Sequence, residues 1–142
     1  MDRLFLDANV LFSAAYRTDA GVRRLWRLPE TEFVTSSYAV EEARRNLDTP
    51  GQRAELDALL ATVRISNLLA DPAAHPEVAQ SGLPEKDVPI LRAAVAAGCT
   101  HLITGDRQHF GHLFGAMVAG VLVLRPAEYL ARRGHRQACR SG

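Results

Sequence analysis

Short apolar runs flanked by charged or turn-forming residues alternate along the chain with longer segments in which apolar residues recur every three or four positions. The short runs are typical of strands that are buried on both faces, as in a parallel sheet, and the longer segments are typical of amphipathic helices. The predicted strands are 3–6, 32–36, 101–104 and 121–125, with 63–69 as a further extended candidate. The predicted helices are 9–16, 20–28, 36 or 37 to about 47, 52–63, a helix that starts within 85–88 and ends at Gly98, and a short helix from about 126.

Capping and helix-breaking residues set the boundaries of these helices. Asn9 can cap the first helix, and Pro29 ends the second. Pro84 and Pro89 bracket the start of the helix that ends at Gly98, because proline is tolerated only in a first turn. The alternation of strands and helices predicts an α/β fold with three layers (α/β/α), in which helices cover both faces of a central parallel sheet of four to five strands.

Three aspartates stand where this fold would bring them to one edge of the sheet. Asp7 directly follows the first strand, and Asp106 follows the strand 101–104 after one glycine. Asp87 lies at the start of the helix that leads into the same strand, on the helical face that carries Leu91. That helix runs antiparallel to the strand, so its start lies at the strand's carboxyl end. The sequence therefore predicts that all three carboxylates converge, at the edge where open α/β sheets bind ligands.

Each aspartate alone has an ordinary interpretation as a turn residue, a helix cap or a partner of the helix dipole. Together, three negative charges at one edge would raise one another's pKa, and a divalent cation removes that cost. Hard oxygen ligands without a paired cysteine or histidine pattern favour Mg²⁺ or Mn²⁺ over zinc. We therefore expect Asp7, Asp87 and Asp106 to hold such an ion. The histidines after Asp106, His109 and His112, are expected at the surface or rim.

A fourth acid is expected from the helix that follows the second strand. Glu41 and Glu42 both flank the apolar stripe of this helix at similar angles. The helical period therefore does not decide which of the two glutamates faces the site. Either could instead be exposed and paired with an arginine one turn away.

Length, charge and apolar runs narrow the class of protein but do not identify a reaction. The 142 residues suit one domain, and a net charge of +1 gives no overall basic field of the kind that marks many nucleic-acid binders. Five arginines gather in residues 125–142, which we expect to end as a solvated basic tail. The longest apolar run, 115–124, is half the length of a membrane span. We expect a cytoplasmic protein without a membrane segment.

Four stretches resemble the PIN domain family in a fixed order: "LFLDANVLFSA", "SSYAVEEARRNL", "EKDVPILRAAVAAGCTHLITGD" and "GVLVLRPAEYL". The resemblance covers residues 3–130 and is most specific in 86–106. It implies a PIN domain over residues 1–130, followed by a basic C-terminal tail over 131–142. The family usually has threonine or serine where Ala8 stands, which would remove one supporting hydrogen bond.

The resemblance implies a Mg²⁺- or Mn²⁺-dependent endoribonuclease that cleaves single-stranded regions of RNA through a water activated by the metal. Many such single-domain proteins resemble the toxin of a bacterial toxin–antitoxin pair (VapC-like), which implies a small antitoxin partner and a homodimer. Arg17 and Arg107 are candidates for contacts with RNA phosphates. Position by position, the family's four acids and two supporting polar residues fall on Asp7, Glu42, Asp87, Asp106, Asn9 and Thr104.

Two alternatives remain open at this point. The chain could be a PIN-like module that binds a partner without catalysis. It could also be a Mg²⁺-dependent aspartyl phosphotransfer domain, which also places acids at strand ends. That class needs a lysine after a strand, whereas the single lysine here, Lys86, stands at a helix start, and its phosphatase branch needs an aspartate where Asn9 stands.

Overall fold

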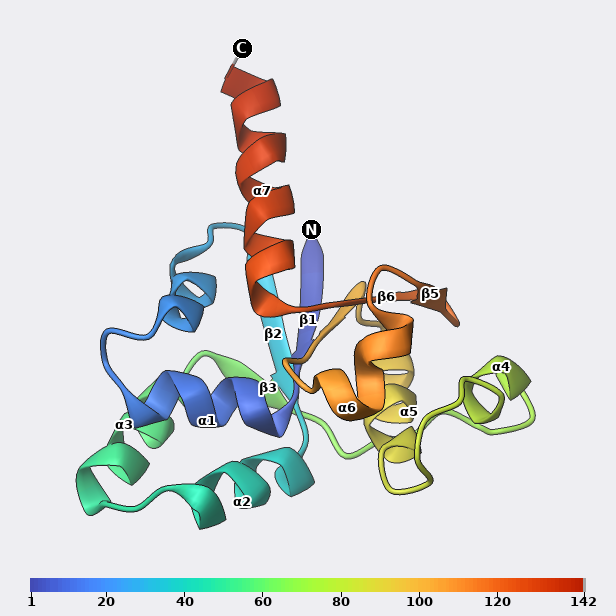
Figure 1. Ribbon diagram of the computed structural model, residues 1–142, viewed down its shortest axis with the longest axis horizontal. Helices are drawn as coiled ribbons and strands as arrows, with labels where there is room; N and C mark the ends of the chain where they lie inside the picture. The colour runs from blue at the N-terminus through green and yellow to red at the C-terminus, as the bar shows by residue number, and fades with distance from the viewer. Residues whose placement is uncertain (142) are drawn as a thin grey trace.

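A six-stranded sheet runs through the middle of the molecule (Figure 1). The computed structural model describes the backbone of residues 1–141 and the side chains of residues 1–136. The strands lie in the order β3-β2-β1-β4-β6-β5, and every neighbouring pair is parallel except β5 with β6. The strands are β1 (Asp2–Leu6), β2 (Thr31–Thr35), β3 (Val63–Ile65), β4 (His101–Ile103), β5 (Met117–Val118) and β6 (Val121–Leu124).

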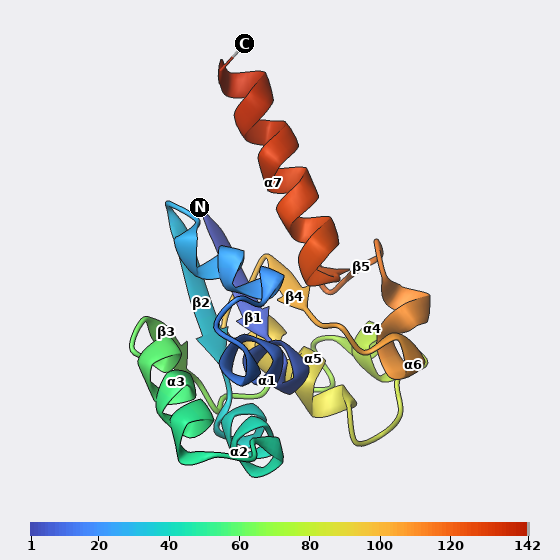
Figure 2. The ribbon, with the colours of Figure 1, turned by 60° about the vertical axis from the view of Figure 1, so that its left-hand side comes forward.

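Helices cover both faces of this sheet, so the predicted three-layer α/β fold is confirmed (Figure 2). The elements α1, α2, α3 and η1 pack on one face, and α4, α5 and α6 pack on the other. The helical elements are α1 (Ala8–Tyr16), η1 (Gly21–Arg27), α2 (Ser37–Asn46), α3 (Pro50–Leu60), α4 (Pro76–Ala79), α5 (Val88–Ala96), α6 (Arg107–Phe110), η2 (Gly111–Leu113) and α7 (Pro126–Ser141).

The central strand β1 shows why an uninterrupted apolar run predicts this fold. Leu4 and Leu6 are fully buried against the layer that contains α1, α2 and α3. Phe5, between them, is fully buried against the layer that contains α5. Successive side chains of a strand point to opposite faces, so both faces of β1 need apolar residues. This burial holds the end of β1, and the residue that follows it, in a fixed place.

Two predicted helices differ from the observed ones in type or start, and the last one, predicted to be short, is the 16-residue α7. The segment 20–28 forms the 3₁₀ helix η1, in which Arg23 and Leu28 donate to carbonyls three residues earlier. Among the described residues no side chain caps its start, and Pro29 follows closely, so the segment forms only tight short-range bonds. α3 begins at Pro50, two residues before its predicted start, because Thr49 and Gln52 form a capping box at this end of the helix.

Several elements are too short for a periodic pattern to predict. α4 and α6 have four residues each, η2 has three and β5 has two. Asp106 starts α6, since its carboxylate accepts a hydrogen bond from the backbone N–H of His109. The stretch 105–115, for which no helix was predicted, therefore contains a turn of helix shortly after β4.

α7 carries the basic stretch of the sequence, and part of it packs against the domain. The helix extends past the rest of the molecule (Figures 1 and 2). Arg133, expected in a solvated tail, is instead buried and donates to Thr31 and to the carbonyl of Pro29, at 2.8 and 2.9 Å. α7 runs without a break past residue 130, so the division of the chain at that point stays a prediction. The side chain of Arg140 lies outside the described residues.

None of the helices that the structure describes has the length and apolar character needed to cross a membrane.

Candidate metal centre

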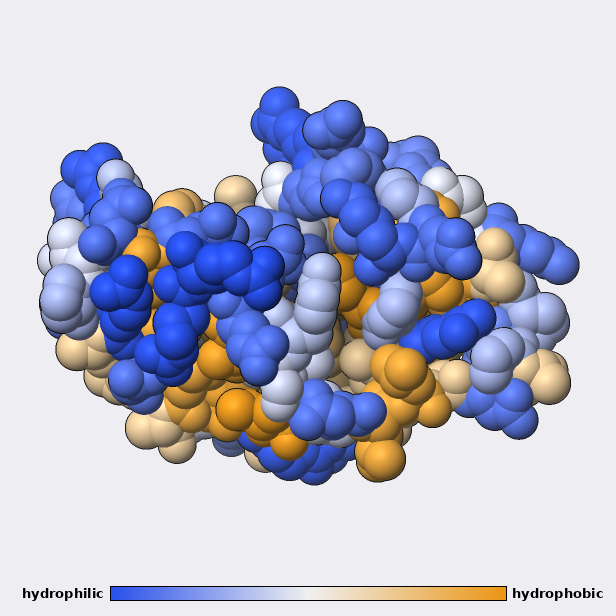
Figure 3. All heavy atoms as spheres, turned by 90° about the horizontal axis from the view of Figure 1, so that it is seen from below, coloured by the Kyte–Doolittle hydropathy of each residue, from blue (hydrophilic) through white to orange (hydrophobic). Residues whose placement is uncertain are grey.

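A cavity of about 680 Å³ opens where β1 and β4 end. These two strands are parallel neighbours, with Leu6 paired to Ile103, so the residues after them start from the same edge. Figure 3 views the molecule from this side, where hydrophilic side chains alternate with smaller hydrophobic patches. All four acids predicted from the sequence line the cavity: Asp7, Glu42, Asp87 and Asp106.

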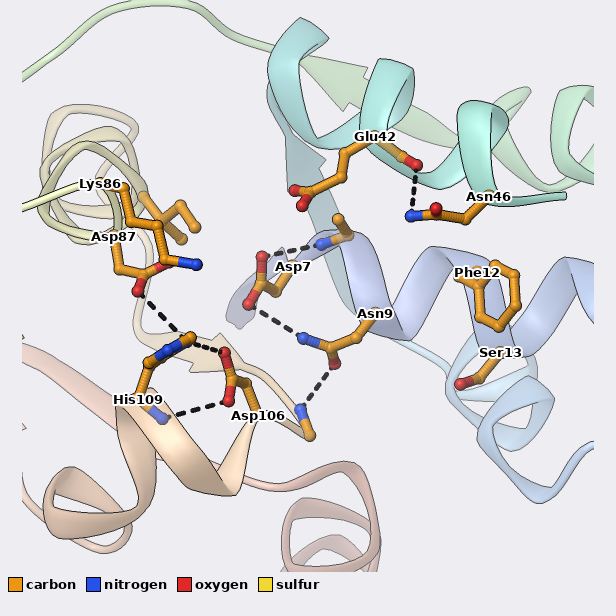
Figure 4. A pocket seen from close by; sticks show the side chains of 13 residues that line it. Asp7, Asn9, Phe12, Ser13, Glu42, Asn46, Lys86, Asp87, Asp106 and His109 are labelled. Carbon is orange, nitrogen blue, oxygen red and sulfur yellow. Dashed lines mark hydrogen bonds and ion pairs between the residues drawn. The ribbon is translucent and has the colours of Figure 1, made fainter. Parts of the chain in front are cut away.

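Asp7 is buried at the bottom of this cavity, with 4% of its surface exposed. Its Oδ1 accepts a hydrogen bond from the backbone N–H of Ala8, and so caps α1. Its Oδ2 accepts a hydrogen bond from Thr104 Oγ1 at 2.8 Å. It also accepts one from Asn9 Nδ2 at 3.1 Å (Figure 4). Burial raises the pKa of Asp7 to about 6, the hydrogen bonds oppose this shift, and the charges of Glu42 and Asp87 add to it.

Asn9 and Thr104 join the two sides of the cavity. Asn9 Nδ2 also donates to Thr104 Oγ1 at 3.1 Å, and Asn9 Oδ1 accepts from the backbone N–H of Gly105 at 2.7 Å. Thr104 Oγ1 in turn accepts from the backbone N–H of Asp106 at 3.2 Å. A side chain at Gly105 would place its Cβ only 3.2 Å from Asn9 Oδ1. The network therefore fixes Asp7 and Asp106 relative to each other.

Asp87 reaches the cavity from the start of α5. A turn in which its backbone N–H donates to the carbonyl of Pro84 at 2.8 Å places it directly before the helix. Only 8% of Asp87 is exposed, and its Oδ2 has no hydrogen-bond partner among the described residues. A buried carboxylate oxygen without a hydrogen bond is costly unless a positive group lies close to it.

Asp106 and His109 form the third side of the cavity. Asp106 Oδ1 accepts from the backbone N–H of His109, and Asp106 Oδ2 lies 2.8 Å from His109 Nδ1. The same ring nitrogen lies 3.4 Å from Asp87 Oδ2 (Figure 4). His109 therefore faces two carboxylates that come from different elements.

Glu42, and not its neighbour Glu41, lines the cavity. α2 turns the carboxylate of Glu42 toward Asp7 (Figure 4). Glu41 is instead exposed to solvent. One turn later, Asn46 Nδ2 donates to the backbone carbonyl of Glu42 at 3.0 Å. The helical period alone does not decide which of the two glutamates lines the cavity, whereas the packing of α2 does.

The two arginines predicted to bind substrate lie outside the cavity lining. Arg17 is exposed beyond the end of α1 and pairs with Asp19 at 3.3 Å. Arg107 is exposed at the start of α6, beside Asp106. The basic residue that does line the cavity is Lys86, next to Asp87.

The donor atoms of this cavity fit a divalent cation. Carboxylate oxygens dominate it, and hard oxygen ligands of this kind suit Mg²⁺ or Mn²⁺. The Oδ2 of Asp87 accepts no hydrogen bond from the described residues and is available for such an ion, and the charge of an ion would offset the burial and the repulsion that raise the pKa of Asp7. Ligand atoms of Asp87, Asp106 and His109 lie within 4.8 Å of one another.

The sequence model of the PIN domain matches residues 3–108, about three quarters of the chain. The chain belongs to the PIN domain family. A solved structure of this fold, VapBC2 from Rickettsia felis bound to a DNA fragment from their promoter, superposes with a TM-score of 0.64. Its chain is 16% identical, and the match covers 87% of this chain and 98% of that one, so it supports the fold. A comparison with curated proteins finds no match.

Two titratable residues that line this PIN domain's cavity were not predicted there from the sequence, Lys86 and His109. His109 was expected at the surface or rim, whereas it lies between Asp87 and Asp106. The available signal was its spacing of three residues after Asp106, which puts both on one side of a capped helical turn. Lys86 carried no comparable signal, because its direction depends on the turn before α5.

Proposed function

We propose that this PIN domain is a metal-dependent endoribonuclease that hydrolyses phosphodiester bonds in single-stranded regions of RNA. The observation that carries the proposal is a cavity lined by four acids from four separate parts of the chain. One of these acids has a buried oxygen without a hydrogen bond, and another has its pKa raised to about 6. Perturbed acids gathered in a cleft are typical of catalytic sites.

Asp7, Asp87 and Asp106 would hold Mg²⁺ or Mn²⁺. A divalent ion bound there supplies Lewis-acid chemistry, which lowers the pKa of water and offsets negative charge on a phosphate. Asn9 and Thr104 keep the Asp7 carboxylate in one orientation through their hydrogen bonds to Oδ2. Such outer hydrogen bonds hold ligands in a productive position.

Glu42 would orient the attacking water and accept its proton. The carboxylate lies on the cavity wall and is directed toward Asp7, without a described hydrogen bond to another side chain (Figure 4). Lys86 lines the same cavity and offers a positive charge to a phosphate oxygen. Arg107 and Arg17, both exposed, would contact more distant phosphates of the RNA.

The fold also supports a more specific proposal, that the chain is the toxin of a toxin–antitoxin pair. Its support is the likeness to a chain of the VapBC2 structure over nearly the whole length of both chains. In that case a small antitoxin protein would bind the domain and block its RNA cleavage, and the domain would act as a homodimer.

The test is cleavage of a single-stranded RNA by the purified protein with Mg²⁺ or Mn²⁺. We expect metal-dependent cleavage that leaves 5′-phosphate and 3′-hydroxyl ends, and a loss of at least about a hundredfold in Asp7→Asn and in Glu42→Gln. Glu41→Gln is the matched control, because Glu41 is the exposed neighbour on the same helix, and it should cleave as the wild type does. Equal cleavage by all four proteins would exclude this cavity as the active site.

A further inference from the structure

We propose that His109 is itself a ligand of the metal ion, through Nδ1, and that this nitrogen makes the site prefer Mn²⁺ to Mg²⁺. The other ligands in direct contact would include Asp87 Oδ2 and Asp106 Oδ2. The inference rests on the proposed function only in that both place a divalent cation in this cavity.

The geometry around His109 fits a shared ion. Its Nδ1 lies 2.8 Å from Asp106 Oδ2 and 3.4 Å from Asp87 Oδ2. In an octahedral site with ligands at about 2.1 Å, neighbouring ligand atoms are about 3 Å apart, because that spacing is the edge of the octahedron. The two observed separations lie on either side of this value. Among the described side chains, no group of three or more ligands with this close spacing includes Asp7 or Glu42.

An independent observation points to a cation at the same place. Asp87 is 92% buried, from its exposed fraction of 8%, and its Oδ2 has no hydrogen-bond partner among the described residues. This oxygen is directed into the cavity and toward the His109 ring (Figure 4). A ligand bond to an ion beside His109 would satisfy it.

The fold holds the backbone of His109 in position through contacts that do not involve Nδ1. The carboxylate of Asp106 caps α6 by accepting from the backbone N–H of His109 at 3.1 Å. The next residue, Phe110, is fully buried in the core and anchors the short helix. The side chain of His109 is 23% exposed, so one side of the ring faces open space where water can complete the coordination of an ion.

The nitrogen ligand changes which ion the site prefers. Mg²⁺ takes oxygen ligands almost exclusively, whereas imidazole nitrogen suits first-row transition metals, of which Mn²⁺ also accepts carboxylates. Coordination through Nδ1 needs the ring tautomer that carries its proton on Nε2. If His109 were only a positioning residue, Nδ1–H would donate to Asp106 and the site would have oxygen ligands alone.

Pulsed electron paramagnetic resonance of the Mn²⁺-loaded protein separates these two roles. We expect ¹⁴N modulation from a directly bound imidazole in the wild type, replaced by a ¹⁵N signal after labelling with ¹⁵N-histidine. The modulation should be lost in His109→Gln. His112→Gln is the matched control, because His112 is exposed three residues later and its Nε2 faces the carbonyl of Ser81, outside the cavity.

Calorimetric titration gives a second measurement that does not depend on RNA cleavage. His109→Gln should weaken Mn²⁺ binding about tenfold and Mg²⁺ binding less than threefold, the scale seen when groups around metal sites are lost. Absence of a nitrogen signal in the wild type, or equal weakening for both ions, would overturn the inference. RNA cleavage without the nitrogen signal would support the proposed function and overturn the inference about His109. The nitrogen signal without RNA cleavage would support the inference about His109 and contradict the proposed function.

Discussion

Two buried aspartates of the same cavity have opposite surroundings. Asp7 accepts three hydrogen bonds, from Ala8, Asn9 and Thr104, whereas Asp87 has an oxygen that accepts none among the described residues. The first carboxylate is fixed in place by the protein, and the second is left for a ligand. The two aspartates complement each other, because a metal site needs carboxylates held in a fixed orientation, such as Asp7, and oxygens free to bind the ion, such as Asp87 Oδ2.

The Thr104 hydroxyl tests the orienting role. Thr104→Val keeps the shape of the side chain but removes the donor to Asp7 Oδ2 and the acceptor for the Asp106 N–H. We expect Mn²⁺ binding, measured by calorimetry, to weaken about tenfold. The matched control is Thr35→Val, which removes a buried hydroxyl that donates to the carbonyl of Leu6 and does not line the cavity. Equal Mn²⁺ affinity in both variants would contradict the orienting role.

The charge of Asp7 should destabilise the protein when no metal is bound. Its pKa is raised from 3.8 to about 6, so at pH 7.5 the carboxylate is charged in both states and the folded state bears the whole cost. Asp7→Asn should therefore raise the free energy of unfolding in EDTA, by up to about 3 kcal/mol from a shift of about two pKa units. Saturating Mn²⁺ should shrink or reverse this difference, because the wild type gains more binding energy from the ion than the variant does.

Urea denaturation at pH 7.5, with EDTA and then with Mn²⁺, measures both differences. Asp48→Asn serves as the control, because Asp48 is exposed. Its replacement should change the free energy of unfolding by no more than about 0.5 kcal/mol, both in EDTA and in Mn²⁺. A wild type more stable than Asp7→Asn in EDTA would show that the hydrogen bonds to Asp7 outweigh its desolvation.

At the scale of single residues, the sequence predicted the acids better than their partners. The strand ends and the helix start pointed to Asp7, Asp87 and Asp106, since topology alone decides which edge they reach. The contact of His109 with two carboxylates depends on a four-residue helix, for which no periodic pattern exists. Whether Glu41 or Glu42 faces the cavity depends on the rotation of α2 against α1, which packing sets.

At the scale of elements, burial made the longer strands and helices predictable. β1, β2, β4 and β6 match the predicted apolar runs to within one residue at each end, and α5 begins at Val88 and ends before Gly98, which has a φ of +66°. The elements that differ are decided locally instead. The capping box at Thr49 starts α3 early, and η1, which has no side-chain cap at its start and is closely followed by Pro29, forms a 3₁₀ helix.

The junction between α7 and β1 gives a pH-dependent prediction. Asp2 Oδ2 accepts hydrogen bonds from Tyr129 at 2.5 Å and Arg136 at 2.6 Å. Burial pushes the pKa of Asp2 up, but these hydrogen bonds and the positive charge of Arg136 outweigh it and hold the pKa below 3.8. The stability that Asp2 contributes is thus present above pH 3.8 and lost as the pH falls through the lowered folded-state pKa.

Asp2→Asn should lower the free energy of unfolding by about 1.5–3 kcal/mol at pH 7, the usual scale for hydrogen bonds to a charged group. The difference from the wild type should shrink as the pH falls below 3.8, as measured by urea denaturation across that range. Asp19→Asn is the control, because Asp19 is 74% exposed and its pair with Arg17 should add little at any pH. A difference that stays constant with pH would mean that packing, and not the carboxylate charge, joins α7 to β1.

At the scale of the whole molecule, the fold gathers carboxylates that are far apart in the chain. Asp7 and Asp106 follow neighbouring parallel strands, and α5 delivers Asp87 to the same edge. This arrangement was predictable because parallel strands and returning helices leave few alternatives. The position of α7 was less predictable, since the burial of Arg133 depends on contacts with residues about one hundred positions earlier.

The most direct test of the account is the position of the ion itself. In a crystal of the protein grown with Mn²⁺, anomalous scattering should give one dominant peak in the cavity, within bonding distance of carboxylate oxygens of Asp87 and Asp106 and beside Asp7. The peak should be absent in crystals of Asp87→Asn. A peak on another face of the molecule, or none at a Mn²⁺ concentration that supports RNA cleavage, would contradict a metal-dependent site built from these acids.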